Sequence, residues 1–104
     1  MGTGWMSQYL EAWSTRDSGR IVEWMTDDCV YEDVTLGETH TGREKLRAAF
    51  TKFYQSGGIK LRYCNKTDAG PITALECYMP SGRPAVAVYE RGGGGKMLAA
   101  RLYL

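Results

Sequence analysis

The residue best suited to moving a proton is Asp33, near the end of the segment Cys29–Val34. This segment is rich in β-branched and aromatic residues and therefore predicts a strand. Alternation along a strand puts Asp33 on the same face as Cys29 and Tyr31. If that face lines an apolar cavity, the carboxylate loses solvation, its pKa rises, and it becomes a usable general base. The alternative is a solvated Asp33 that caps the turn at Val34–Leu36.

Tyr9 is the matching candidate for a hydrogen-bond donor. It lies on the apolar stripe of a helix expected over Trp5–Trp13. A tyrosine there is either a core residue with its hydroxyl at the rim or, in a dry site, a donor to a developing oxyanion. Six other residues are candidates to line a cavity beside these two groups, and each is equally explained as plain core: Trp13, Met25, Tyr31, Phe50, Tyr54 and Tyr89.

His40, the only histidine, is a possible auxiliary group between the expected strand and the helix that follows it. The alternative is a solvated loop histidine. We expect no metal site, although four acidic residues lie close together in the sequence. Glu32 and Asp33 point to opposite faces of the strand, and Asp27 and Asp28 close the preceding helix. No His or Cys stands near these four residues in a ligand pattern.

The composition predicts one compact domain over residues 1–104. Hydrophobic residues make up 43% of the 104 residues and charged residues 24%, which argues against disorder. A formal charge of +1 with scattered basic residues predicts neither nucleic acid nor an anionic membrane as a partner. Three widely spaced cysteines suit a reduced, cytoplasmic protein better than a disulfide framework; they are Cys29, Cys64 and Cys77.

The elements that position these groups begin with helices. Asp17 or Ser18 is the expected N-cap of a second helix, because either side-chain oxygen can accept an unpaired backbone N–H. That helix carries Ile21, Val22, Trp24 and Met25 and is expected to end at residues 26–28. The strand 29–34 follows, then a turn-like stretch over Thr35–Gly42 and a third amphipathic helix over 42–55.

The second half of the sequence changes to strands. Four strand-like segments are separated by turn residues, at 59–65, 72–79, 84–90 and 96–104. Their spacing predicts sequential antiparallel hairpins. The four glycines Gly92–Gly95 are expected to form a hairpin tip, because a strand rather than a helix follows them. Helices followed by consecutive strands predict an α+β fold.

Two segments resemble a known superfamily. The segment Gln8–Asp33 is similar to the opening of ketosteroid isomerases and SnoaL-like proteins, and Lys96–Leu104 resembles their last strand. The order of elements is also that of the NTF2-like superfamily. This resemblance implies an NTF2-like, or cystatin-like, cone: three N-terminal helices packed on a curved, mostly antiparallel β-sheet.

The resemblance also implies roles for individual residues. Asp33 matches the catalytic aspartate of ketosteroid isomerases, and Tyr9 matches the tyrosine that donates to the enolate oxygen. The second donor of those enzymes, a protonated aspartate, falls near Ala87, where this chain has no carboxyl. Glu90 is a possible auxiliary, but it has the opposite strand parity to Ala87 and is expected to face away. The isomerase tyrosine matching Phe50 has lost its hydroxyl here.

These features lead to a functional expectation. We expect a SnoaL-like or ketosteroid isomerase-like enzyme, an isomerase or polyketide cyclase, that binds a small hydrophobic carbonyl compound of polyketide or terpenoid type. We expect the enzyme to need no cofactor, and we expect it to form a homodimer. Two alternatives stay open: a non-catalytic module for ligand binding or dimerisation, and an epoxide hydrolase that activates water.

Overall fold

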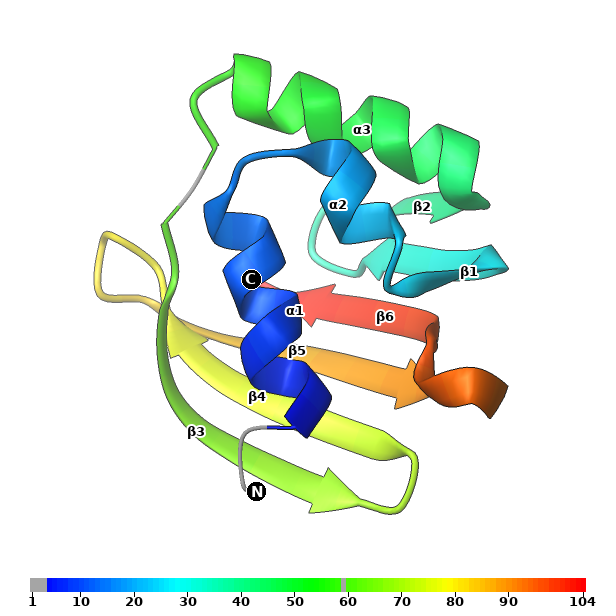
Figure 1. Ribbon diagram of the computed structural model, residues 1–104. Coiled ribbons are helices and arrows are strands. Elements are labelled where there is room, and N and C mark those ends of the chain that lie inside the picture. Colours follow the sequence, from blue (N-terminus) through cyan, green and yellow to red (C-terminus); the bar gives the residue numbers. More distant parts are fainter. Residues whose placement is uncertain (1–3, 59) are drawn as a thin grey trace.

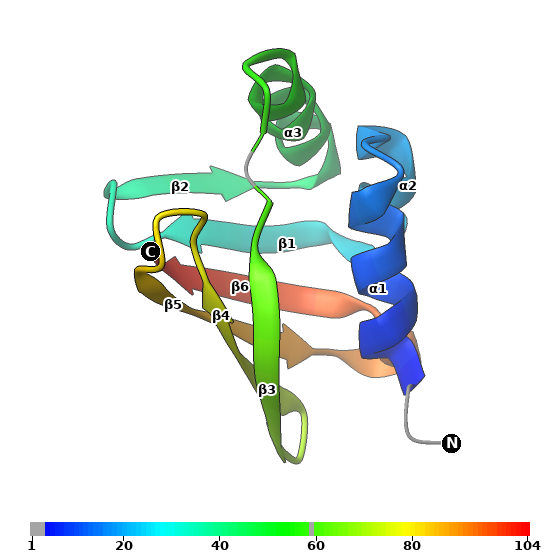
Figure 2. The ribbon, with the colours of Figure 1, turned by 90° about the vertical axis from the view of Figure 1, so that its left-hand side faces the viewer.

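The computed structural model describes residues 4–58 and 60–104. Three helices cover one face of a curved six-stranded sheet (Figures 1 and 2). The helices are α1 (Gly4–Ser14), α2 (Ser18–Val22) and α3 (Arg43–Gln55). The strands are β1 (Met25–Asp33), β2 (Glu38–Thr41), β3 (Arg62–Ala69), β4 (Ile72–Tyr78), β5 (Pro84–Arg91) and β6 (Met97–Tyr103), with a 3₁₀ turn, η1 (Gly93–Gly95), between the last two. The expected α+β class is confirmed.

The sheet has the strand order β2-β1-β6-β5-β4-β3. Strands β3 to β6 form the expected antiparallel meander, and the hairpin of β1 and β2 joins its β6 edge. The pairing of β1 with β6 is parallel, and the other neighbouring pairs are antiparallel. Both β1 and β6 therefore lie inside the sheet. Asp33, at the end of β1, is flanked by β2 on one side and β6 on the other.

Three element boundaries differ from the sequence prediction. Helix α2 ends at Val22 and β1 already begins at Met25, four residues before the predicted strand. Pairing of Met25 with Met97 of β6 recruits this stretch into the sheet, so tertiary contacts override the local pattern. The stretch predicted as a turn contains β2, which pairs with β1. The strand predicted at 59–65 is observed as β3 and runs on to Ala69, while residue 59 lies outside the described residues.

Two local features fix how the helices meet the sheet. The Asp17 carboxylate is the N-cap of α2, as predicted, and its Oδ1 accepts hydrogen bonds from the backbone of Gly19 at 2.9 Å and Arg20 at 3.4 Å. Gly42 precedes α3 with a φ of 93°, a conformation that favours glycine. Its N–H donates to the carbonyl of Cys29 at 2.9 Å. The start of α3 is therefore tied directly to β1.

The space between the helices and the sheet is filled largely by aromatic rings. Tyr9, Met25, Cys29, Leu46 and Met97 are among its fully buried residues. Edge-on ring contacts link α1 to α3 through Trp13 and Phe50, and α1 to β5 through Tyr9 and Tyr89. Among the described residues, no helix is both long and apolar enough to cross a membrane.

Candidate functional site

Asp33 ends β1 and is half-buried. Its Oδ1 accepts a hydrogen bond from the backbone N–H of Leu36 at 2.9 Å, which is the turn-capping contact considered from the sequence. Alternation nevertheless puts Asp33 on the inner face of the sheet with Cys29 and Tyr31, which are both buried. Its carboxylate is also close enough to contribute to the raised pKa of Tyr31. Oδ1 is therefore held by the turn, and Oδ2 is the oxygen left to accept a proton.

Tyr9 projects from α1 into the interior and is fully buried. No side chain among the described residues meets its hydroxyl with hydrogen-bond geometry, although Trp13 and Tyr89 lie close enough to influence its pKa or have their own pKa influenced by it. Burial, followed by the neighbouring Tyr31, raises the pKa of Tyr9 well above its ordinary value, so the phenol stays protonated. An unpaired buried hydroxyl costs roughly 1–3 kcal/mol of stability. Such a group is expected at a site where a ligand supplies the missing acceptor.

Three further tyrosines surround Tyr9. The ring of Tyr89 lies 5.4 Å from that of Tyr9, centroid to centroid, and Tyr31 belongs to the same buried cluster. Tyr63 of β3 was not predicted from the sequence as a site residue, yet it contributes to the raised pKa values of Tyr9, Tyr31 and Tyr89. Burial, followed by Cys77 and Tyr54, raises the pKa of Tyr63 itself to about 12. Phenols from α1, β1 and β5 thus meet in the buried cluster, and Tyr63 of β3 is a partly exposed neighbour that influences their pKa values.

Two hollows open on the surface. One, of about 340 Å³, lies between α1 and β3. The other, of about 500 Å³, lies between the α1–α2 connection and α3 and is lined by polar residues together with Tyr54. Neither hollow is lined by Tyr9 or Asp33. Tyr9 is enclosed in the packed interior, whereas Asp33 is half-buried at the end of β1 beside an exposed turn.

The match of a family model to residues 6–95 decides the relationship: the model is that of the SnoaL-like domain. The chain belongs to the SnoaL-like family. The resemblance stated from the sequence is thereby confirmed. No curated protein matches the sequence.

Solved structures agree with this SnoaL-like fold. A putative polyketide cyclase from Sinorhizobium meliloti is similar with a TM-score of 0.82 at 16% identity, over 93% of this chain and 91% of that one. A SnoaL-like protein of unknown function from Burkholderia thailandensis gives 0.80 at 15% identity, over 94% and 89%. SalBIII, an epoxide hydrolase/cyclase-like enzyme in pyran ring formation of salinomycin, gives 0.78 at 19% identity, over 94% and 85%. At these identities the likeness concerns the fold alone.

The cavity-lining candidates of the SnoaL-like domain pack against one another. Trp13 contacts Phe50 with ring centroids 4.9 Å apart, and Phe50 contacts Tyr31 at 5.1 Å. The hydroxyl of Tyr54 donates to the carbonyl of Trp13 at 2.8 Å, so it ties α3 to α1. Met25 is fully buried at the start of β1. Met25, Tyr31, Phe50 and Tyr89 thus belong to the buried core, and Trp13 and Tyr54 pack against it.

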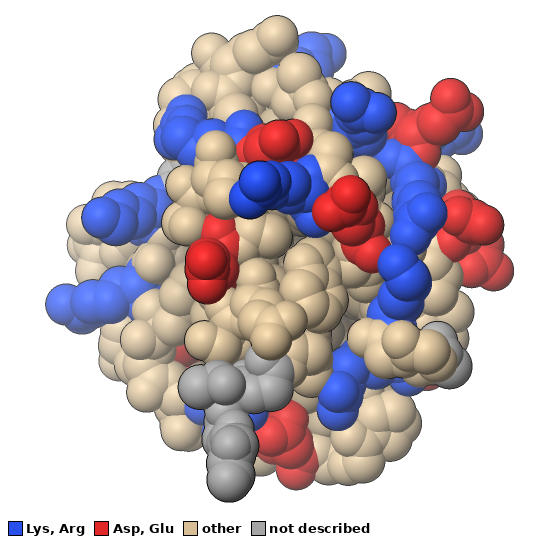
Figure 3. All heavy atoms as spheres, viewed as in Figure 1, with Lys and Arg blue, Asp and Glu red and all other residues tan. Residues whose placement is uncertain are grey.

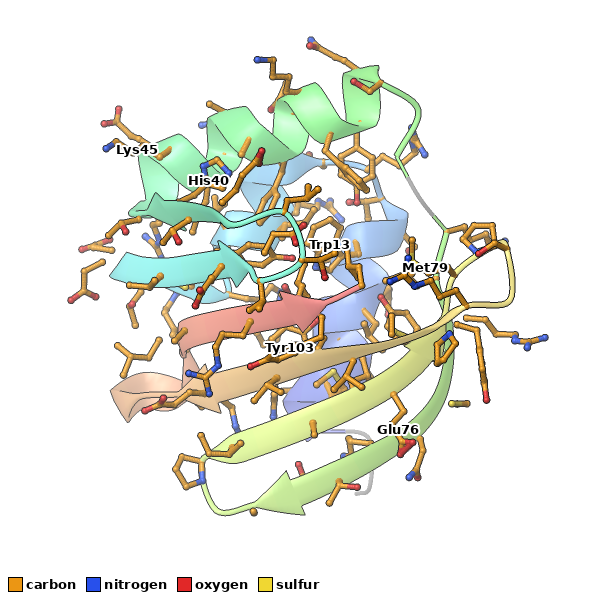
Figure 4. The ribbon with its side chains drawn as sticks, turned by 180° about the vertical axis from the view of Figure 1, so that it is seen from behind. Trp13, His40, Lys45, Glu76, Met79 and Tyr103 are labelled. Carbon is orange, nitrogen blue, oxygen red and sulfur yellow. The ribbon has the colours of Figure 1, made fainter. Side chains whose placement is uncertain are left out.

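The auxiliary candidates lie on different faces of the sheet. Register places His40 opposite Tyr31 and Glu38 opposite Asp33, so all four side chains share the inner face at the β2 edge. Figure 4 labels His40, which lies beside α3. The imidazole Nε2 of His40 is 4.0 Å from Glu38 Oε1. Glu90, in contrast, alternates with buried Tyr89 and belongs to the outer face. Among the described residues, no three His, Cys, Asp or Glu side chains group as metal ligands.

Proposed function

We propose that this SnoaL-like domain is a cofactor-independent enzyme that binds a small hydrophobic carbonyl compound, polyketide- or terpenoid-like, and moves a proton on it. The observation that supports this most is the Tyr9 hydroxyl, which is fully buried, protonated and without a partner among the described residues. A carbonyl oxygen would supply the missing acceptor, and the surrounding rings would supply apolar contact.

In the proposed reaction Asp33 takes a proton from the carbon next to the carbonyl. The C–H electron pair becomes the enolate double bond, and the carbonyl electrons move onto the oxygen. Tyr9 donates a hydrogen bond to that oxygen and keeps its own proton, because burial holds its pKa high. The protonated Asp33 then returns the proton to a carbon of the same framework, which gives an isomer or prepares ring closure.

A non-catalytic ligand-binding module is the second candidate. The bond from Leu36 to Asp33 Oδ1 favours it, because a turn cap alone explains an aspartate at this position. The lack of a carboxyl at Ala87 and of a hydroxyl at Phe50 favours it too. Epoxide opening ranks lower, because its support is a likeness in fold to one such enzyme.

Deuterium uptake separates an enzyme from a binding module. 2-Tetralone in D₂O is incubated with the protein, and NMR follows exchange at the carbons next to the carbonyl. We expect exchange faster than in buffer, with Asp33→Asn lowering it by about 10²–10⁴-fold and Tyr9→Phe by about 10²-fold. Tyr78→Phe, on the outer face, is the control and should exchange like the unmodified protein. Ligand binding without exchange would instead support the non-catalytic module.

We also infer that the domain forms a homodimer through the outer face of its sheet. Apolar side chains gather there from four strands: Val30, Ala74, Val86, Val88, Ala99 and Tyr103. Val30 and Tyr103 are 39% and 43% exposed, which is unusual for large apolar residues on one surface. Tyr103 and Glu76 mark this face in Figure 4.

A further inference from the structure

The hollow between α1 and β3 has a floor that belongs to the core. Met6 of α1 and Leu75 of β4 line it, and both are buried, while Leu10 is half-buried. The rim is polar and consists of Ser7, Cys64, Asn65 and Lys66. Figure 2 shows β3 at the edge of the sheet, and the hollow lies between this strand and α1. A small molecule in the hollow would therefore contact residues of the core.

Tyr63 is the residue that joins this hollow to the phenol cluster. Register pairs it with Cys77, whose side chain is buried on the inner face, so Tyr63 faces inward too. A bulge at Cys64 then shifts the register, and Lys66, opposite Leu75, also faces inward. Tyr63 keeps 39% of its surface exposed and lines the hollow, while burial of the rest raises its pKa to about 12.

A ligand oxygen in the proposed site needs a second donor. A carbonyl or enolate oxygen accepts two hydrogen bonds, and Tyr9 provides one. Tyr63 is the candidate for that donor, because its side chain faces inward and lines the hollow from the side opposite α1. Its strand β3 is the edge of the sheet, and all eight of its residues are exposed. Among the described residues β3 has one neighbouring strand, β4, so this edge strand can yield a little when a ligand enters.

We propose that the hollow between α1 and β3 is the mouth of the Tyr9 site and that Tyr63 is the second donor to the ligand oxygen. The ligand is a flat, hydrophobic carbonyl compound that enters past Met6 and Leu10 with its oxygen leading. Its oxygen then lies between Tyr9 and Tyr63, and any polar group at its far end lies near Lys66. This inference rests on the proposed function, because it assumes that a ligand binds at Tyr9.

The test uses 2-naphthol, whose phenolic oxygen stands in for the enolate oxygen, and two readouts. The first is its dissociation constant, measured by naphthol fluorescence. We expect Tyr63→Phe and Tyr9→Phe each to weaken binding about tenfold. Tyr78→Phe is the matched control and should bind unchanged. Circular dichroism confirms that each variant is folded.

The second readout is alkylation of Cys64 by N-ethylmaleimide. Cys64 is exposed in the mouth, whereas Cys29 and Cys77 are buried and burial raises the pKa of both thiols. Only Cys64 should therefore react in the folded protein, as peptide mass spectrometry will show. Saturating 2-naphthol should slow this reaction at least severalfold.

The outcomes separate the two claims. Binding that weakens in Tyr9→Phe, without protection of Cys64 and without an effect of Tyr63→Phe, overturns the mouth and the second donor but leaves the proposed function intact. Absence of 2-naphthol binding in the unmodified protein overturns both. Protection of Cys64 with unchanged affinity in Tyr63→Phe keeps the mouth and removes the donor, and the proposal as stated then fails.

Discussion

At the scale of single residues, the site depends on a polar atom that folding leaves without a partner. Tyr9 is buried in an aromatic environment, and its hydroxyl has no acceptor among the described residues. Asp33 presents one oxygen to a turn and shares the inner face with Tyr31. Tyr9 therefore has the properties of a hydrogen-bond donor and Asp33 those of a proton acceptor, and the proposed function requires both to act on the same small molecule.

Replacing Tyr9 should separate stability from binding. Tyr9→Phe removes the unpaired hydroxyl, and we expect the free energy of unfolding to rise by about 1–2 kcal/mol in urea denaturation. Tyr54→Phe is the control: its hydroxyl donates to Trp13, and its loss should lower the same free energy by about 1 kcal/mol. A less stable Tyr9→Phe protein would show that this hydroxyl has a partner.

The tyrosines also predict how stability depends on pH. The pKa of Tyr63 is raised to about 12, so the folded protein holds its proton more tightly than the unfolded chain does. Its contribution to stability is full below about pH 10 and is lost as pH rises through about 12. Burial raises the pKa values of Tyr9, Tyr31 and Tyr89 as well, so they add in the same direction.

Denaturation curves at pH 8 to 12, with tyrosinate absorbance near 295 nm, measure this dependence. The unfolding midpoint should fall above about pH 10, and Tyr63→Phe should weaken the fall. A midpoint independent of pH up to 12 would mean that these phenols titrate alike in the folded and unfolded chains.

At the scale of elements, the sequence predicted the features that depend on near neighbours. The Asp17 cap, the glycine start of α3 and the shared face of Cys29 and Tyr31 all follow from local chemistry or strand parity. Strand β2 could not be predicted, because its polar residues form a strand only through pairing with β1.

Tyr63 was missed for a related reason. The direction of its side chain depends on its partner Cys77 and on the bulge at Cys64, and neither is visible from one strand alone. The sequence also could not show whether the aromatic residues line a space or fill it, because side-chain packing decides that. Trp13, Phe50 and Tyr31 contact one another directly.

Gly42 provides a test of how α3 is anchored to β1. Its φ of 93° strains any residue with a Cβ, although the nearest atom to such a Cβ, the Asp27 carbonyl oxygen, is at an ordinary 3.5 Å. We expect Gly42→Ala to lower the free energy of unfolding by about 1–2 kcal/mol. Gly92 has a φ of −100°, and a Cβ added there would make only ordinary contacts with Leu98. Gly92→Ala should therefore change the free energy of unfolding by no more than about 0.5 kcal/mol. If Gly42→Ala and Gly92→Ala lowered the free energy of unfolding equally, backbone strain at Gly42 would not be the cause.

At the scale of the whole molecule, the two faces of the sheet have different partners. The inner face meets the helices, and no helix or strand of residues 4–58 and 60–104 covers the outer face. Basic and acidic side chains are interspersed on the helix-bearing side in Figure 3, and the formal charge is +1, so electrostatics do not select a strongly charged partner. The exposed apolar residues of the outer face instead suit a second copy of the chain.

Oligomeric state tests this inference. Tyr103→Lys places a charge on the outer face at a residue that is 43% exposed, and light scattering after size-exclusion chromatography should show a monomer. Leu36→Lys, at a residue that is 68% exposed in the β1–β2 turn, is the matched control and should stay dimeric. A monomeric unmodified protein would contradict the interface.

The most direct test of the central claim is a crystal structure of the protein with 2-naphthol. We predict its oxygen within hydrogen-bond distance of the Tyr9 hydroxyl, at about 2.5–3.0 Å, with Asp33 Oδ2 facing the ring carbons beside it. The rings around Tyr9 would separate to admit the ligand. The account would be contradicted if 2-naphthol bound only in the hollow between the α1–α2 connection and α3, near Arg16 and Gln55, with the Tyr9 hydroxyl still enclosed and unpaired.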